Sequence, residues 1–206
     1  MKKLIMLVMA ALMMGVSPLM AQDKALAKAQ KKEMRQKVKQ FTKEGWKIFG
    51  STRTLEGALL THYQKLAASD DVFEIPGVNS SFVSKNVGKQ STLTSACAYF
   101  ASMMDSEIEG QVMNDMQSNA NFNKDEFDKF YAAFKRHAAT TIKGELKESF
   151  SVIRDKGDGT FEMQTFYLVD AQKAADARQR ALTNAAAETK ISQQYAKSIE
   201  DFIKAN

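Results

Sequence analysis

Cysteine is nearly absent from this 206-residue chain, which contains one copy, Cys97. A single cysteine excludes an internal disulfide, although an intermolecular one stays possible. Leu93, Cys97, Phe100, Met104 and Ile108 recur every three or four residues, which predicts one face of an amphipathic helix with Cys97 at its centre. No cationic residue flanks this cysteine to lower its pKa, so we interpret it as a small apolar core side chain.

Histidine is also scarce, and the motifs that bind metals or nucleotides fail at specific positions. His62 and His137 do not form a ligand pair, and there is no second cysteine to complete a common zinc site. RDKGDGTFEM resembles a calcium loop, but Arg154 and Lys156 occupy two of the positions that need oxygen ligands, so we predict a hairpin turn. We therefore predict no metal, no cofactor and no catalytic residues, although a Ser-His-Asp triad assembled by the fold stays open.

A large excess of one charge is missing as well. The chain has 29 basic and 24 acidic residues, and without Lys2 and Lys3 the balance is 27 against 24, or +3. This balance does not favour nucleic acid as a partner.

Long apolar runs are absent, and the longest one, Leu4–Val16, is shorter than the roughly 20 residues that a membrane-spanning helix needs. Lys2 and Lys3 precede it and Ala21 follows it, which is the layout of a secretory signal peptide over residues 1–21 with cleavage near Ala21. The alternative is an uncleaved N-terminal anchor. We predict a bacterial protein exported to the periplasm or the exterior, with no membrane span in the mature chain.

Residues 22–44 are rich in lysine and predict a basic helical extension. Met34, Val38 and Phe41 form a narrow apolar stripe. The basic residues that could contact anionic lipid headgroups or a polyanion, as a peripheral membrane contact would require, are Lys31, Lys32, Arg35 and Lys39. The alternative for these side chains is a solvated helix face.

Residues 45–206 are expected to form a single domain. LKESFSVIR and TFEMQTFYLV flank a turn of Asp and Gly, which predicts a β-hairpin. A short strand or turn should bury Trp46, and residues 69–90 read as irregular, with VFEIPG and SFVSKNV as possible short strands. The predicted helices include one around His62, with Leu59, Leu60, Tyr63 and Leu66 on one side, one from about Leu93 to Met116, and one carrying Phe127, Phe130, Phe134, Ala138 and Ile142.

Glycine and proline are absent after Asp170, so residues 171–204 should form one long helix or two in line. Ile191, Tyr195, Ile199 and Phe202 form an apolar stripe at its end. This stripe could pair with a partner helix or pack on the core of the protein itself.

The order of these elements resembles the LPP20-like family of bacterial envelope proteins. The resemblance covers roughly residues 46–185 and is carried by the alanine-rich segment Ala96–Val112 and the hairpin strand Gly159–Val169. It implies a compact α+β domain with helices on one face of a small antiparallel sheet, and it supplies no catalytic residues. Many family members are lipoproteins, whereas this chain lacks the lipobox cysteine. Independently, several helices and one clear hairpin predict the α+β class, with a long C-terminal helix.

These observations predict a non-enzymatic envelope protein that acts through contacts with other envelope proteins or with itself. The alternative is a surface module that binds anionic lipid or polysaccharide through the basic N-terminal segment. An enzyme of unrecognised type stays open as a third interpretation, and a deep pocket with paired, buried titratable groups would favour it.

Overall fold

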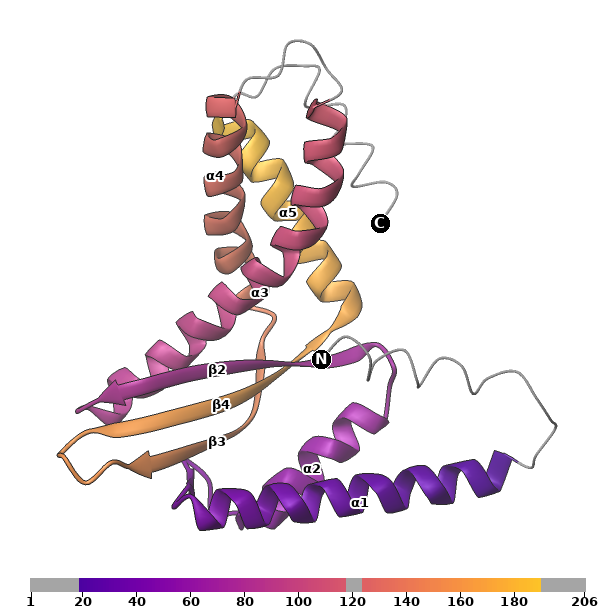
Figure 1. Cartoon of the computed structure of the whole chain (residues 1–206), viewed down its shortest axis with the longest axis vertical. Helices are drawn as coiled ribbons and strands as arrows, with labels where there is room; N and C mark the ends of the chain where they lie inside the picture. Colours follow the sequence, from indigo (N-terminus) through magenta and orange to yellow (C-terminus); the bar gives the residue numbers. More distant parts are fainter. Residues whose placement is uncertain (1–18, 118–123, 190–206) are drawn as a thin grey trace.

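The computed structural model describes the backbone of residues 19–117 and 124–189, and the side chains of residues 31–103 and 124–189. The elements are, in order, α1 (Leu19–Lys43), β1 (Lys47–Phe49), α2 (Leu55–Ala67), β2 (Val72–Phe82), α3 (Lys85–Gln117), α4 (Lys124–Ile142), β3 (Lys147–Asp155), β4 (Phe161–Asp170) and α5 (Ala171–Thr189). Figure 1 shows one sheet with helices on both of its faces, and α4, α5 and the far half of α3 form a group above it, on the β2 side. The predicted α+β class is confirmed.

The sheet has four antiparallel strands in the order β1-β3-β4-β2. Its centre is the predicted β3–β4 hairpin, which is confirmed. The turn needs two glycines in the left-handed region, because Gly157 and Gly159 have φ of 79° and 82°. Asp155 accepts a hydrogen bond from the Gly157 amide at 2.8 Å, and Asp158 accepts one from the Thr160 amide at 2.9 Å. The carboxylates of Asp155 and Asp158, in the sequence that resembles a calcium loop, therefore stabilise the hairpin turn through hydrogen bonds to its backbone.

Residues 69–90, predicted to be irregular, are mostly regular: Val72–Phe82 form the eleven-residue outer strand β2, which contains the possible strand VFEIPG, and α3 begins at Lys85. Pro76 and Gly77 led to the wrong prediction, but an outer strand tolerates proline, because the missing N–H can face away from the sheet. The nearby outward-facing amide of Val78 donates a hydrogen bond to Ser95 Oγ of α3 at 3.3 Å. SFVSKNV is not a second strand, since β2 ends at Phe82 and α3 begins at Lys85, two turns before the predicted start near Leu93.

Successive side chains of β4 face opposite sides of the sheet. Phe166 packs into a cluster with Met34, Phe41 and Leu59 from the layer formed by α1 and α2. Tyr167 packs into a second cluster, under α3. Helices therefore cover both faces, whereas the LPP20-like resemblance implies helices on one face only.

The apolar stripe of α1 anchors this helix to the sheet. Met34 and Phe41 are buried, Val38 packs beside them, and Trp46 closes the cluster, as expected from the sequence. The prediction for α2 is partly wrong. Ala58, Leu59 and His62 are its buried residues, whereas Leu60 is 47% exposed.

α3 crosses β2 closely and then leaves the sheet to join α4 and α5 (Figure 1). Cys97 and Phe100 are buried against the sheet, as predicted. The five predicted core residues of α4, from Phe127 to Ile142, are all buried. α5 presents small residues to this group (Ala174, Ala177, Ala181 and Ala185), so the helices approach closely.

None of the helices among the described residues combines the length and hydropathy that a membrane-spanning helix requires. This finding agrees with the absence of a second long apolar run in the sequence.

Candidate functional site

The outer face of α1 is the strongest candidate site among the residues predicted from the sequence. Lys31, Lys32, Arg35 and Lys39 are all exposed on α1, at the spacing of one helix face, while Met34 and Phe41 turn toward the core. The burial of the apolar stripe therefore fixes the direction in which the basic residues point. We call these four residues the basic face.

The basic face carries little compensating charge. Residues 31–43 contain six cations (Lys31, Lys32, Arg35, Lys37, Lys39 and Lys43) and one acidic residue, Glu33. Within the part of the chain that the structure describes, no ion pair engages any residue of the basic face. Lys37 differs from them, because its ammonium lies 5.4 Å from the ring centroid of Phe166, on the core side of the helix.

A groove of about 500 Å³ runs between α1 and α2, next to the basic face. Lys31, Met34 and Arg35 line it from α1, and Leu60 and Tyr63 line it from α2. Two basic residues and one carboxylate, Glu56, therefore border a largely apolar depression that contains a half-exposed leucine. This combination suits a ligand that presents negative charge and apolar surface together.

The second predicted set, Ile191, Tyr195, Ile199 and Phe202, lies outside the described residues. Their assignment to a partner helix therefore stays a prediction.

A polar cluster that the sequence did not predict lies under α2. His62 is 2% exposed; its Nε2 lies 2.6 Å from Glu74 Oε2, and its Nδ1 lies 3.0 Å from Ser149 Oγ. Phe150 and Phe166 surround the imidazole with edge-to-face contacts at centroid distances of 5.3 and 6.0 Å. With Nε2–H donating to Glu74, the ring is held in one orientation, and both of its nitrogens have a partner.

A β-bulge explains how Ser149 reaches this histidine. The β3–β4 register shifts between Glu148 and Phe150, so Ser149 is the extra residue. Glu148 then faces α3, where it pairs with Lys89, while Ser149 and Phe150 both face α2. Ser149, His62 and Glu74 are linked in the same order as a serine–histidine–carboxylate triad. In the usual triad Nε2 contacts the serine and Nδ1 the carboxylate, whereas here Nδ1 contacts Ser149 and Nε2 contacts Glu74.

A second polar cluster, under α3, joins the two central strands to the helix. Thr92, Thr165 and Ser151 are buried, with contacts between their hydroxyl oxygens of 3.0 Å (Thr92–Thr165) and 2.9 Å (Thr165–Ser151). Ser151 in turn donates to Glu148 at 2.8 Å. Lys89 lies 3.1 Å from Ser151 Oγ, as in a Ser–Lys pair, but Ser151 is 1% exposed and out of reach of a substrate. The cluster satisfies polar groups that would otherwise destabilise the core.

Two other residues considered from the sequence are tied into the fold. Cys97 is buried, and this burial raises the pKa of its thiol, which agrees with a packing role. The side chain of His137 is 26% exposed, and its Nε2 lies 2.8 Å from Glu188 Oε2 on α5. The sequence did not reveal this link, because the two residues are 51 positions apart.

A comparison with protein-family models finds no match, and comparisons with curated proteins and with solved structures find none either. The functional argument therefore depends on the residues of this chain.

Proposed function

We propose that this is an exported bacterial envelope protein that acts by binding rather than by catalysis, and that the basic face attaches it to an anionic lipid surface. Support for export comes from the layout of residues 1–21. The sequence pattern of roughly residues 46–185 resembles the LPP20-like family of envelope proteins, and this resemblance adds to the proposal. The single observation that carries lipid binding is the basic face, four exposed cations next to the groove between α1 and α2 that form no ion pair with the described residues.

The geometry suits a lipid surface for two reasons. Each Lys or Arg close to an anionic membrane contributes about 1 kcal/mol of attraction, so four together give useful affinity at moderate salt. The half-exposed Leu60 and the apolar wall of the groove could then enter the headgroup boundary. An anionic polysaccharide offers the charge but no apolar surface for the groove, so lipid is the better fit.

The test is co-sedimentation of the mature protein with vesicles of phosphatidylcholine alone and with added phosphatidylglycerol, at low and moderate salt. Binding should need the anionic lipid and weaken as salt rises. Arg35→Glu/Lys39→Glu should reduce the affinity at least tenfold. The matched control is Lys124→Glu/Lys129→Glu, which changes the charge equally at exposed positions of α4 and should bind like the unmodified protein.

An equal loss of vesicle affinity in both double variants would mean that binding depends only on the net charge of the protein, and it would contradict the proposed site. Binding to dextran sulfate but not to the vesicles would replace lipid by polysaccharide.

Protein–protein contact, the first function predicted from the sequence, is supported as a second candidate by one observation. Five of the six large apolar side chains that are exposed in the described region lie on β2, α3 or the turn between them (Val78, Val83, Val87, Tyr99 and Met103). Tyr99 and Met103 are four residues apart, so they are neighbours on one face of α3, whereas Val87 lies about 120° around the helix from Tyr99. Neighbouring exposed apolar side chains are typical of a surface that a partner covers.

The Tyr99→Lys variant tests this candidate. It should abolish self-association measured by light scattering, or capture of a specific envelope protein, if this face of α3 is the contact. Leu60→Lys, which changes an exposed apolar residue elsewhere, is the control. Truncation after Thr189 tests separately whether Ile191, Tyr195, Ile199 and Phe202 form the contact.

A further inference from the structure

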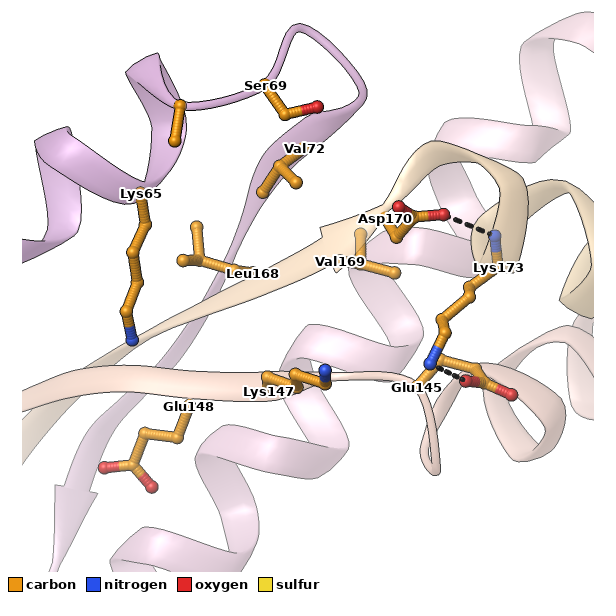
Figure 2. A pocket seen from close by; sticks show the side chains of 11 residues that line it. Lys65, Ser69, Val72, Glu145, Lys147, Glu148, Leu168, Val169, Asp170 and Lys173 are labelled. Atoms are coloured by element: carbon orange, nitrogen blue, oxygen red, sulfur yellow. Dashed lines mark hydrogen bonds and ion pairs between the residues drawn. The ribbon is translucent and has the colours of Figure 1, made fainter.

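α2 covers one face of the sheet but stops short of one end of that face. α2 ends at Ala67, whereas Val72 of β2 and Leu168 of β4 lie further along on the same side. The result is an open cavity of about 480 Å³, shown in Figure 2. This volume lies in the usual range of small-molecule sites.

The walls of the cavity come from segments far apart in the sequence. Lys65 and Ala68 stand at the end of α2, Lys147 begins β3, and Lys173 lies in the first turn of α5. In the register of the sheet, Leu168 lies opposite Lys147, so an apolar floor and a cation are direct neighbours. Figure 2 shows Lys65 extending from α2 past Leu168 toward β3.

The carboxylates around the cavity already have partners. Glu145 Oε1 accepts a hydrogen bond from Arg180 at 3.1 Å, and its Oε2 lies 3.7 Å from Lys173 Nζ. Asp170 accepts a hydrogen bond from the backbone amide of Lys173 at 3.2 Å.

Glu148 is also engaged, and on the opposite side of the sheet. It pairs with Lys89 of α3, and in Figure 2 its side chain points away from Lys65 and Leu168. Glu148 lines the cavity as well, but its carboxylate is already paired with Lys89 and hydrogen-bonded by Ser151.

Two of the three lysines of the cavity have no such partner. Neither Lys65 nor Lys147 forms an ion pair or a side-chain hydrogen bond with any residue that the structure describes. The cavity thus combines an apolar floor with two ammonium groups that pair with none of the described residues. A ligand complementary to it has an apolar body and one anionic end.

We propose that this cavity binds a small organic carboxylate, with its apolar body on Leu168 and Val72 and its carboxylate paired with Lys65 and Lys147. The site shares no residue with the basic face and does not depend on the proposed lipid attachment. The lysines supply charge-assisted hydrogen bonds, and the sheet end gains apolar cover that α2 does not provide.

The probe is octanoate, compared with its uncharged amide, in an NMR titration of the full mature chain. Octanoate should shift the amide signals of residues 65–72, 145–148 and 168–173, and the uncharged amide should bind more weakly at the same place. Lys65→Gln/Lys147→Gln should weaken octanoate binding about fivefold and leave binding of the uncharged amide unchanged. Because both lysines are exposed, this variant should fold normally.

Two controls keep the test specific. Lys124→Gln/Lys129→Gln removes the same charge at exposed positions on α4 and should bind octanoate like the unmodified protein. Ala68→Trp should block the cavity and abolish binding of both probes. The proposal is overturned if octanoate leaves these three segments unshifted, or if Lys65→Gln/Lys147→Gln binds it with undiminished affinity. Neither result affects the vesicle assay, which probes other residues with another ligand.

Discussion

Gly77 of β2 lies directly against the backbone of Thr92 in α3: a Cβ atom at Gly77 would stand 2.0 Å from the Thr92 carbonyl oxygen. α3 can approach the outer strand this closely only because the strand has no side chain there. The contact positions the buried hydroxyl of Thr92 over the sheet, where it meets Thr165.

Gly77→Ala should therefore destabilise the protein by about 3 kcal/mol, because the clash is with backbone and cannot be relieved by a rotamer change. Chemical denaturation followed by circular dichroism measures the loss. Gly144→Ala is the matched control, since a Cβ there meets nothing within 4 Å, and its effect should stay within about 0.5 kcal/mol. Equal effects of the two substitutions would mean that glycine flexibility, rather than close packing, explains Gly77.

The His62 cluster leads to a prediction about additivity. His62→Leu leaves the half-buried Glu74 carboxylate without its partner and should cost about 2 kcal/mol. His62→Leu/Glu74→Met removes both polar groups, so it should cost less than the sum of the two single variants. Equilibrium unfolding of the three variants gives the coupling free energy. Strict additivity, within about 0.5 kcal/mol, would show that the 2.6 Å contact contributes nothing of its own.

The elements that the sequence predicted well are those whose signals are local. The β3–β4 hairpin follows from a turn of Asp and Gly between two runs rich in β-branched and aromatic residues, and both strands pair through that turn. The buried row of α4 follows from the spacing of Phe127, Phe130 and Phe134. Both patterns lie within twenty or so residues and need no knowledge of distant contacts.

The features that were missed depend on distant partners. In a sequence, Pro76 indicates a break in a strand unless that strand is known to lie at the edge of the sheet. The edge position of β2 is set by its pairing with β4, far along the chain. His62 takes a core position because Ser149, 87 residues away, is turned toward it by a bulge. Lys65 and Lys147 of the sheet-end cavity are 82 positions apart, and neither is part of a motif. The basic face was predicted because all four of its residues lie on one helix.

The chemical reactivity of Cys97 should reflect its burial. Since burial raises the pKa of the thiol and shields it, a maleimide should label the native protein roughly 100-fold more slowly than the unfolded protein at neutral pH. Mass spectrometry of quenched samples follows the labelling. Tyr99→Cys in a Cys97→Ala background places a thiol two residues away at an exposed position, and it should label rapidly. Rapid labelling of native Cys97 would contradict its role as a core side chain.

The Glu188 link between α4 and α5 should make the stability depend on pH in the acid range. Hydrogen bonds from Arg136 and His137 lower the pKa of Glu188 below its ordinary value of 4.5. A carboxylate with a lowered folded pKa stabilises the protein fully above its unfolded pKa, and this contribution is lost as the pH falls through the folded pKa. Glu188→Gln should therefore have a lower Tm than the unmodified protein above about pH 5, and this difference in Tm should shrink as the pH falls toward about 3.

The control is Asp128→Asn, at an exposed position of α4. Its difference in Tm from the unmodified protein should not shrink with falling pH in the same thermal scans. A difference in Tm for Glu188→Gln that stays constant down to about pH 3 would show that the carboxylate charge does not hold the two helices together.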